Sequence, residues 1–222
     1  MDPLAQTVEV RAFSTDEEMN SAMQKKVEAI YADVLTSAPV AAAHAAYEAA
    51  QQNVVKLKKA QANLSGRARE VFDEMKEASS SVDTLLIESQ DGAEVSKRLR
   101  TLAALEAEHK ALLRANSRII EHLLPQAEIA ELSRGADHLT VKARAVREAA
   151  SERIQKTAQL MAEAAEYEGG IVFDAVNTLS GELHRQASEF DRQAGNYHTW
   201  AREREEQYLK LAKEMESLRS IR

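Results

Sequence analysis

The chain contains no cysteine, and only three prolines and seven glycines occur among its 222 residues. The absence of cysteine excludes disulfide bonds and thiolate zinc sites. The scarcity of proline and glycine leaves few positions at which a helix would have to end. Aromatic residues make up 5% of the chain, so few large side chains are available for a thick globular core. These shortages favour long helices that pack along narrow seams.

The chain also lacks an excess of positive charge. It carries 29 Lys and Arg against 36 Asp and Glu, which gives a net charge of −7. A nucleic-acid-binding domain usually has a basic stripe and a high isoelectric point, whereas the isoelectric point here is about 5.5. We therefore expect no nucleic-acid partner. No leader-like N-terminus and no run of 18 apolar residues is present, so we expect a soluble, cytoplasmic protein.

The most regular pattern in the chain is an apolar stripe through about residues 38–90. Its positions follow alternating steps of three and four, and Gln61 is the only polar member. A repeat of 3.5 residues over this length predicts a helix that supercoils against a partner helix. The stripe consists of Val40, Ala43, Tyr47, Ala50, Val54, Leu57, Gln61, Leu64, Ala68, Val71, Met75, Ala78, Val82 and Leu85.

Capping and turn residues divide the remainder of the chain into a flexible arm and three more helices. The arm covers residues 1–14, and a short helix over 15–36 begins at "STDEE". Gly92 in "SQDGAE" predicts a turn, after which a helix over 93–133 ends at the loop "SRGAD", residues 133–137. Within that helix, Pro125 predicts a kink or a break.

The last predicted helix spans 138–220 and contains the glycine pair Gly169–Gly170. Its apolar stripe stays in phase across the pair, and no capping residue precedes Ile171. The pattern therefore favours one continuous helix, with or without a kink at the glycines. A turn at the glycines is the alternative, because two glycines destabilise a helix interior by about 2 kcal/mol.

The C-terminal part of this helix carries a further seam with alternating steps of three and four. A continuous helix over 138–220 would extend beyond the other helices, so its seam would need cover from a second chain. We therefore expect a homodimer or a larger oligomer. The candidate oligomer seam is Phe190, Ala194, Tyr197, Ala201, Tyr208, Leu211 and Met215.

Motifs for catalysis and for metal binding are missing. Glu106 and His109 have the spacing used in di-metal helical bundles, but such a site needs a second pair. His109 and Asn116 lie seven residues apart on one stripe, and together with Gln61 they suit buried polar residues that fix helix register. No phosphate loop or nucleophile motif occurs. We expect no enzymatic activity, no metal and no cofactor.

These patterns predict an all-α fold: an elongated antiparallel helical bundle or coiled coil of three long helices plus a short N-terminal helix. Residues 15–222 would form a single domain. The expected function is a non-enzymatic scaffold or adaptor that binds itself and another, unknown protein. In layout alone the chain is similar to the BAR domain family, which implies membrane-curvature binding as the alternative. The net acidity of the chain disfavours a membrane surface as partner.

Overall fold

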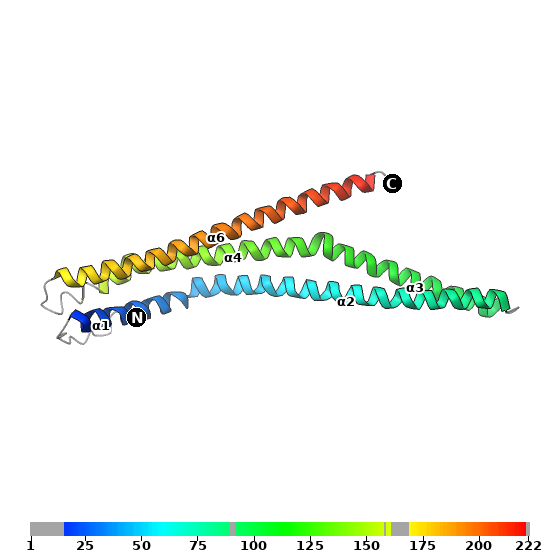
Figure 1. The fold of residues 1–222 in the computed structure, drawn as a ribbon, viewed down its shortest axis with the longest axis horizontal. Coiled ribbons are helices and arrows are strands. Elements are labelled where there is room, and N and C mark those ends of the chain that lie inside the picture. The colour runs from blue at the N-terminus through cyan, green and yellow to red at the C-terminus, as the bar shows by residue number, and fades with distance from the viewer. Residues whose placement is uncertain (1–15, 89–91, 158, 161–168, 221–222) are drawn as a thin grey trace. The chain divides into compact units, whose positions relative to one another are not determined.

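The computed structural model describes residues 16–88, 92–157, 159–160 and 169–220 (Figure 1). Every residue in these ranges except Thr36 and Ser37 is helical, which confirms the predicted all-α class. The helices are α1 (Asp16–Leu35), α2 (Ala38–Glu88), α3 (Gly92–Arg118), η2 (Ile119–Leu123), α4 (Leu124–Glu148), η3 (Ala149–Ile154) and α6 (Gly169–Ser220), of which η2 and η3 are π-helical. The expected N-terminal arm, residues 1–14, lies outside the described residues.

The junction between α1 and α2 is closed by two side chains. The Thr36 hydroxyl donates to the carbonyl of Ala32 at 3.1 Å, and the Ser37 hydroxyl donates to the carbonyl of Val34 at 2.7 Å. The Ala41 amide donates to the carbonyl of Ser37 at 2.9 Å, so Ser37 lies at the N-cap of α2. Pro39 lies in the first turn of α2, where its missing N–H costs no hydrogen bond.

The apolar stripe predicted for residues 38–90 faces inward along the whole of α2. All fourteen stripe positions are buried or half-buried. The most deeply buried of them include Val40, Val54, Ala68 and Val82, which recur at multiples of seven residues, together with Val71. Burial of a stripe with this spacing explains why the helix stays regular for 51 residues.

The predicted loop at residues 133–137 is wrong. Helix α4 continues through this segment, and Gly135 lies in its interior. A Cβ atom at Gly135 would lie 2.5 Å from Cε1 of Tyr197 and 3.2 Å from Cε2 of Tyr47. Glycine is therefore present because two tyrosine rings pack against the helix backbone, and its role is close packing and not chain reversal.

The predicted continuous helix over 138–220 is also wrong. The Ser180 hydroxyl lies 3.5 Å from the carbonyl oxygen of Ala150, whereas 30 residues of straight helix would separate them by about 45 Å. The chain therefore reverses its direction between these two residues, and Gly169–Gly170 begin α6. The preceding residues, 161–168, lie outside the described part of the chain. An apolar stripe that stays in phase is expected for one continuous helix. It is equally expected for two successive helices that bury the same face in a common core.

Pro125 neither ends the helix nor separates two domains. It is the second residue of α4, directly after the π-helical segment η2. The Leu124 amide donates to the carbonyl of Ile119, the wider spacing of a π-turn. In a regular α-helix the ring of Pro125 would clash with the carbonyl of Glu121. Because Glu121 lies inside η2, the wider turn accommodates the proline.

The chain divides into two compact units that share its long helices. The first unit comprises residues 1–48 and 132–200, and the second comprises residues 49–131 and 201–222. In the first unit, α1, α4, η3 and α6 surround one apolar core. Its buried members are Met23, Val27, Ile30, Val34, Ala143, Val146, Ala149, Ala150, Ile154, Val176, Leu183 and Ala187.

In the second unit, ion pairs and hydrogen bonds join α2, α3, α4 and the end of α6. Lys58 pairs with Glu128 at 3.4 Å, and Arg67 pairs with Glu108 at 3.0 Å. Residue numbers therefore rise along α2 as they fall along its neighbour, and Figure 1 shows α2 and α3 side by side. Arg204 of α6 also donates to Glu128 at 3.0 Å. Glu128 thus links three helices.

Candidate interaction face on helix α3

One side of α3 is held by α2. The His109 ring lies 5.6 Å from the Phe72 ring, and the Arg67 guanidinium donates to the carboxylate of Glu108 at 3.1 Å. Ile119, at the start of η2, is buried. These contacts fix which side of α3 faces α2, and therefore which side faces away from α2.

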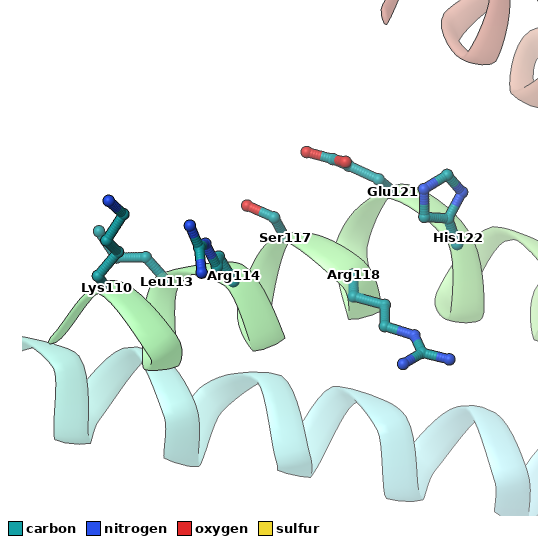
Figure 2. A pocket seen from close by; sticks show the side chains of 7 residues that line it. All are labelled: Lys110, Leu113, Arg114, Ser117, Arg118, Glu121 and His122. Atoms are coloured by element: carbon teal, nitrogen blue, oxygen red, sulfur yellow. The ribbon is translucent and has the colours of Figure 1, made fainter. Parts of the chain in front are cut away.

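The opposite side of α3 borders an open groove of about 650 Å³. Figure 2 shows the side chains of Lys110, Arg114, Ser117 and Glu121 on the side of the helix that points away from α2. Steps of three and four residues place these side chains on one helix face. The groove is lined by Lys110, Leu113, Arg114, Ser117, Arg118, Glu121 and His122.

The charge of α3 is opposite to that of the whole chain. The helix carries six Lys and Arg against three Glu, whereas acidic residues prevail in the full sequence. We define the basic face of α3 as Arg100, Lys110, Leu113, Arg114 and Arg118, of which Arg118 lies at the edge nearest α2 and extends toward that helix (Figure 2). Within the described part of the chain, none of its four cations forms an ion pair, and all four are exposed.

Exposed leucine and isoleucine side chains accompany these cations. Leu113 is 47% exposed, and Leu99 and Ile120, on the same side of the helix, are 46% and 44% exposed. An exposed apolar residue alone needs no explanation, but several of them beside unpaired charges are typical of a surface that binds another molecule. The basic face therefore combines apolar contact area with cations that form no ion pair among the described residues, next to Glu121 in the same groove.

The sequence analysis missed this face. Its cations are four and ten residues apart, so no basic run marks them in the linear sequence, and only Lys97, Arg98 and Arg100 form a local cluster. Of that cluster, Arg98 pairs with Glu94 at 3.1 Å. A projection of the sequence onto a helix would have placed Lys110, Arg114 and Arg118 on one side.

The three predicted register-setting residues lie on inward-facing positions. Gln61, His109 and Asn116 are each half-buried. Asn116 Oδ1 is buried and has no hydrogen-bond partner among the described residues. A role in helix register stays a prediction for all three, since a buried polar atom disfavours misaligned packing only where the correct alignment satisfies it.

The predicted oligomer seam is mostly covered within the single chain. Phe190 packs against the core of the first unit. The Lys142 ammonium lies over the Phe190 ring, 4.7 Å from the ring centroid. Ala194 and Ala201 are buried, while Tyr197, Tyr208 and Met215 are half-buried. Only Leu211 of the seam is exposed, at 56%. Exposed apolar side chains also occur outside the seam, among them Leu113 of the basic face.

The first unit contains a cluster of aromatic and histidine side chains around Gly135. The His44 and His138 rings lie 5.0 Å apart, and the Tyr47 and Tyr197 hydroxyls lie 3.5 Å apart. Burial lowers the pKa of His138, and the nearby His44 and Lys142 lower it further. His44 also pairs with Glu48 at 3.2 Å.

The rings of this cluster pack against one another. Tyr47 stacks on His138, with ring centroids 6.3 Å apart, and Nδ1 of His138 is buried without a hydrogen-bond partner in the described ranges. A catalytic histidine would need a partner that orients it. No group of three metal-ligating side chains occurs among the described residues, and Glu106 and His109 gain no further ligand there.

None of the described helices has the length and apolar character needed to cross a bilayer. Comparison with protein-family models, with curated proteins and with solved structures finds no match to the chain.

Proposed function

We propose that the chain is a non-enzymatic helical scaffold that binds proteins through exposed helix faces and associates with a second copy of itself. We further propose that its helices form an antiparallel coiled-coil bundle. The order of the pairs Lys58–Glu128 and Arg67–Glu108 supports opposite helix directions. The buried positions of α2 at multiples of seven residues support coiled-coil packing.

The basic face of α3 is the observation on which this proposal rests. It presents Leu113 beside Lys110, Arg114 and Arg118, which form no ion pair in the described part of the chain, and Glu121 lines the same groove. Several arginines elsewhere in the chain form ion pairs, as with Arg147 and Asp191 or Arg153 and Asp33. Unpaired cations around exposed leucine suit a partner that supplies both carboxylates and apolar contacts.

The size of the core also favours a scaffold over an enzyme. The largest side chains with less than 2% exposure are Met23, Val71, Val146 and Ile154. They fill seams between helices. Substrate pockets are usually concave and bury most of a small ligand. The groove on α3 is open and lined by side chains of one helical segment, which suits contact with another helix.

Substitution of the basic face tests the proposal. Leu113→Glu removes apolar contact area at the face, whereas Val55→Glu changes an exposed valine of α2 in the same unit. We expect sedimentation velocity at micromolar concentration to give a dimer for the native chain and for Val55→Glu, and a shift toward monomer for Leu113→Glu. Identical dimer fractions for both variants would remove the basic face from the proposal.

Binding to a membrane surface is the second candidate function, and the same four cations favour it. Anionic lipid attracts juxtaposed Lys and Arg by about 1 kcal/mol for each residue near the surface. Co-sedimentation with phosphatidylserine vesicles tests this candidate. Binding that decreases at high salt and is lost on Arg114→Glu would support it, while an unbound native chain at low salt would dismiss it.

A further inference from the structure

We propose that the basic face of α3 is occupied by the C-terminal part of α6 from a second copy of the chain. This inference rests on the proposed self-association and assigns its two surfaces. The acidic face of α6, as we define it, consists of Glu205, Leu209, Ala212 and Glu216. It lies in the same unit as the basic face.

The spacing of these four residues makes a single helix face. They are separated by four, three and four residues, which is the periodicity of one side of an α-helix. Leu209 is 50% exposed, and both carboxylates are exposed. Neither Glu205 nor Glu216 forms an ion pair within the described ranges.

The two faces are complementary in charge and in apolar character. The basic face places Leu113 beside Lys110 and Arg114, and the acidic face places Leu209 beside two carboxylates. Arg202 and Lys213, seven residues before and four residues after Leu209, border the acidic face directly along one side. Opposite charges around an apolar centre fix the alignment of two helices and speed their encounter.

The acidic face of α6 cannot cover the basic face of its own chain while the present contacts hold. Tyr208 accepts a hydrogen bond from Nε2 of Gln126 at 3.3 Å and lies 3.5 Å from Nδ1 of His122. Arg204 donates to Glu128. Since successive residues of an α-helix are rotated by about 100°, Leu209 points well away from the direction in which Tyr208 is held.

A second copy satisfies both faces at once. If α6 of one chain lies on α3 of its partner, the same contact recurs with the chains exchanged, and the interface closes as a two-fold dimer. Each exposed leucine then gains an apolar neighbour, and each unpaired charge gains a counter-charge. A separate acidic protein would leave the acidic face of α6 uncovered, so the second copy accounts for more of the exposed surface.

Cross-linking between single-cysteine variants tests the inference, because the native chain has no cysteine. Leu113→Cys and Leu209→Cys are prepared separately, mixed as folded protein and treated with a short bismaleimide. We expect a covalent dimer that joins position 113 of one chain to position 209 of the other, identified by peptide mass spectrometry. The matched control replaces Leu113→Cys with Val55→Cys, which is 65% exposed on α2, and should give at most a tenth of the product.

A charge-reversal pair provides a second, independent readout. Arg114→Glu is expected to raise the dimer Kd about 10-fold by placing like charges together, and Glu205→Lys should do the same. In an isologous dimer the double variant Arg114→Glu/Glu205→Lys restores both contacts. Recovery of the native Kd would support the assignment, and additive losses would overturn it.

The remaining outcomes separate this inference from the proposed function. A chain that is dimeric by sedimentation but gives no 113–209 product overturns the inference and leaves self-association intact. A chain that stays monomeric overturns both. In the double variant Leu113→Cys/Leu209→Cys, a cross-link within one chain would overturn the inference in favour of the chain's own α6. Loss of phosphatidylserine-vesicle binding on Arg114→Glu, without a change in dimer Kd, would overturn it in favour of a membrane surface.

Discussion

The ring of Tyr197 packs against the backbone of Gly135, so that a Cβ at position 135 would lie 2.5 Å from Cε1 of the tyrosine. The two residues are on different helices, α4 and α6, which approach closely at this point. The contact explains why a glycine occupies the interior of a helix, where it is ordinarily unfavourable.

Gly135→Ala should therefore destabilise the protein although alanine is the better helix former. Alanine would contribute about 0.5–1 kcal/mol through helix propensity, but overpacking against the ring costs about 1–3 kcal/mol. We expect a lower urea midpoint for unfolding. The matched control is Gly181→Ala, at a helical glycine with open space around it, which should raise the midpoint. A stabilised Gly135→Ala variant would show that the ring moves away freely.

Ile154 provides a test of the core of the first unit. Its side chain is fully buried, with 0% exposure. Ile154→Ala should lower the free energy of unfolding by about 2–5 kcal/mol and Ile154→Val by about 0.5–1.5 kcal/mol. The exposed Val55→Ala serves as control and should change the free energy of unfolding by less than about 0.5 kcal/mol. Chemical denaturation followed by circular dichroism measures all three, and equal effects for Ile154→Ala and Val55→Ala would contradict the described core.

Glu128 joins α2, α4 and α6 through Lys58 and Arg204. Its carboxylate is 21% exposed, whereas the side chains of Lys58 and Arg204 are 57% and 40% exposed. Partly exposed ion pairs contribute about 1 kcal/mol or less, and salt screens them. We expect Glu128→Gln to lower stability by about that amount at low salt and by less at 1 M salt. A loss that does not depend on salt would assign the effect to packing.

The pH dependence of stability should include a contribution from His138. Burial lowers the pKa of His138 below the ordinary histidine value of 6.5, and His44 and Lys142 lower it further. The unfolded chain therefore binds this proton more tightly than the folded chain does. The stability that neutral His138 contributes is fully present above pH 6.5. It is lost as the pH falls through and below that value.

His138→Gln should reduce the difference in urea midpoint between pH 7.5 and pH 5.5. Charged groups around His138 are His44 and Glu48 on α2 and Lys142 on α4, and the variant leaves them in place. His198→Gln removes an exposed histidine of α6 and should leave the difference as in the native chain. An unchanged pH difference in His138→Gln would show that other groups account for it.

The sequence predicts the helical class well because the stripe of α2 is long and regular. All fourteen predicted positions face inward, and such a run outweighs the weak helix propensity of Gly66, which lies off it. The end of α1 can be predicted from the sequence equally well, because Ser37 and Pro39 are local signals that act through their own backbone.

The errors arise where a residue acts through a distant part of the chain. Gly135 reads locally as a loop residue, and only the contact with Tyr197, 62 positions later, shows its packing role. The reversal before Gly169 is hidden because the stripes on both sides face the same core, as the buried Ile154 and Val176 demonstrate. The basic face was missed because its cations are adjacent on a helix and separated in the sequence.

The mass of the native chain in solution tests self-association most directly. Light scattering on a dilution series, coupled to size-exclusion chromatography, should give twice the chain mass of 24.6 kDa at micromolar concentration and approach a single chain mass on dilution. A mass of 24.6 kDa at every concentration would contradict the account.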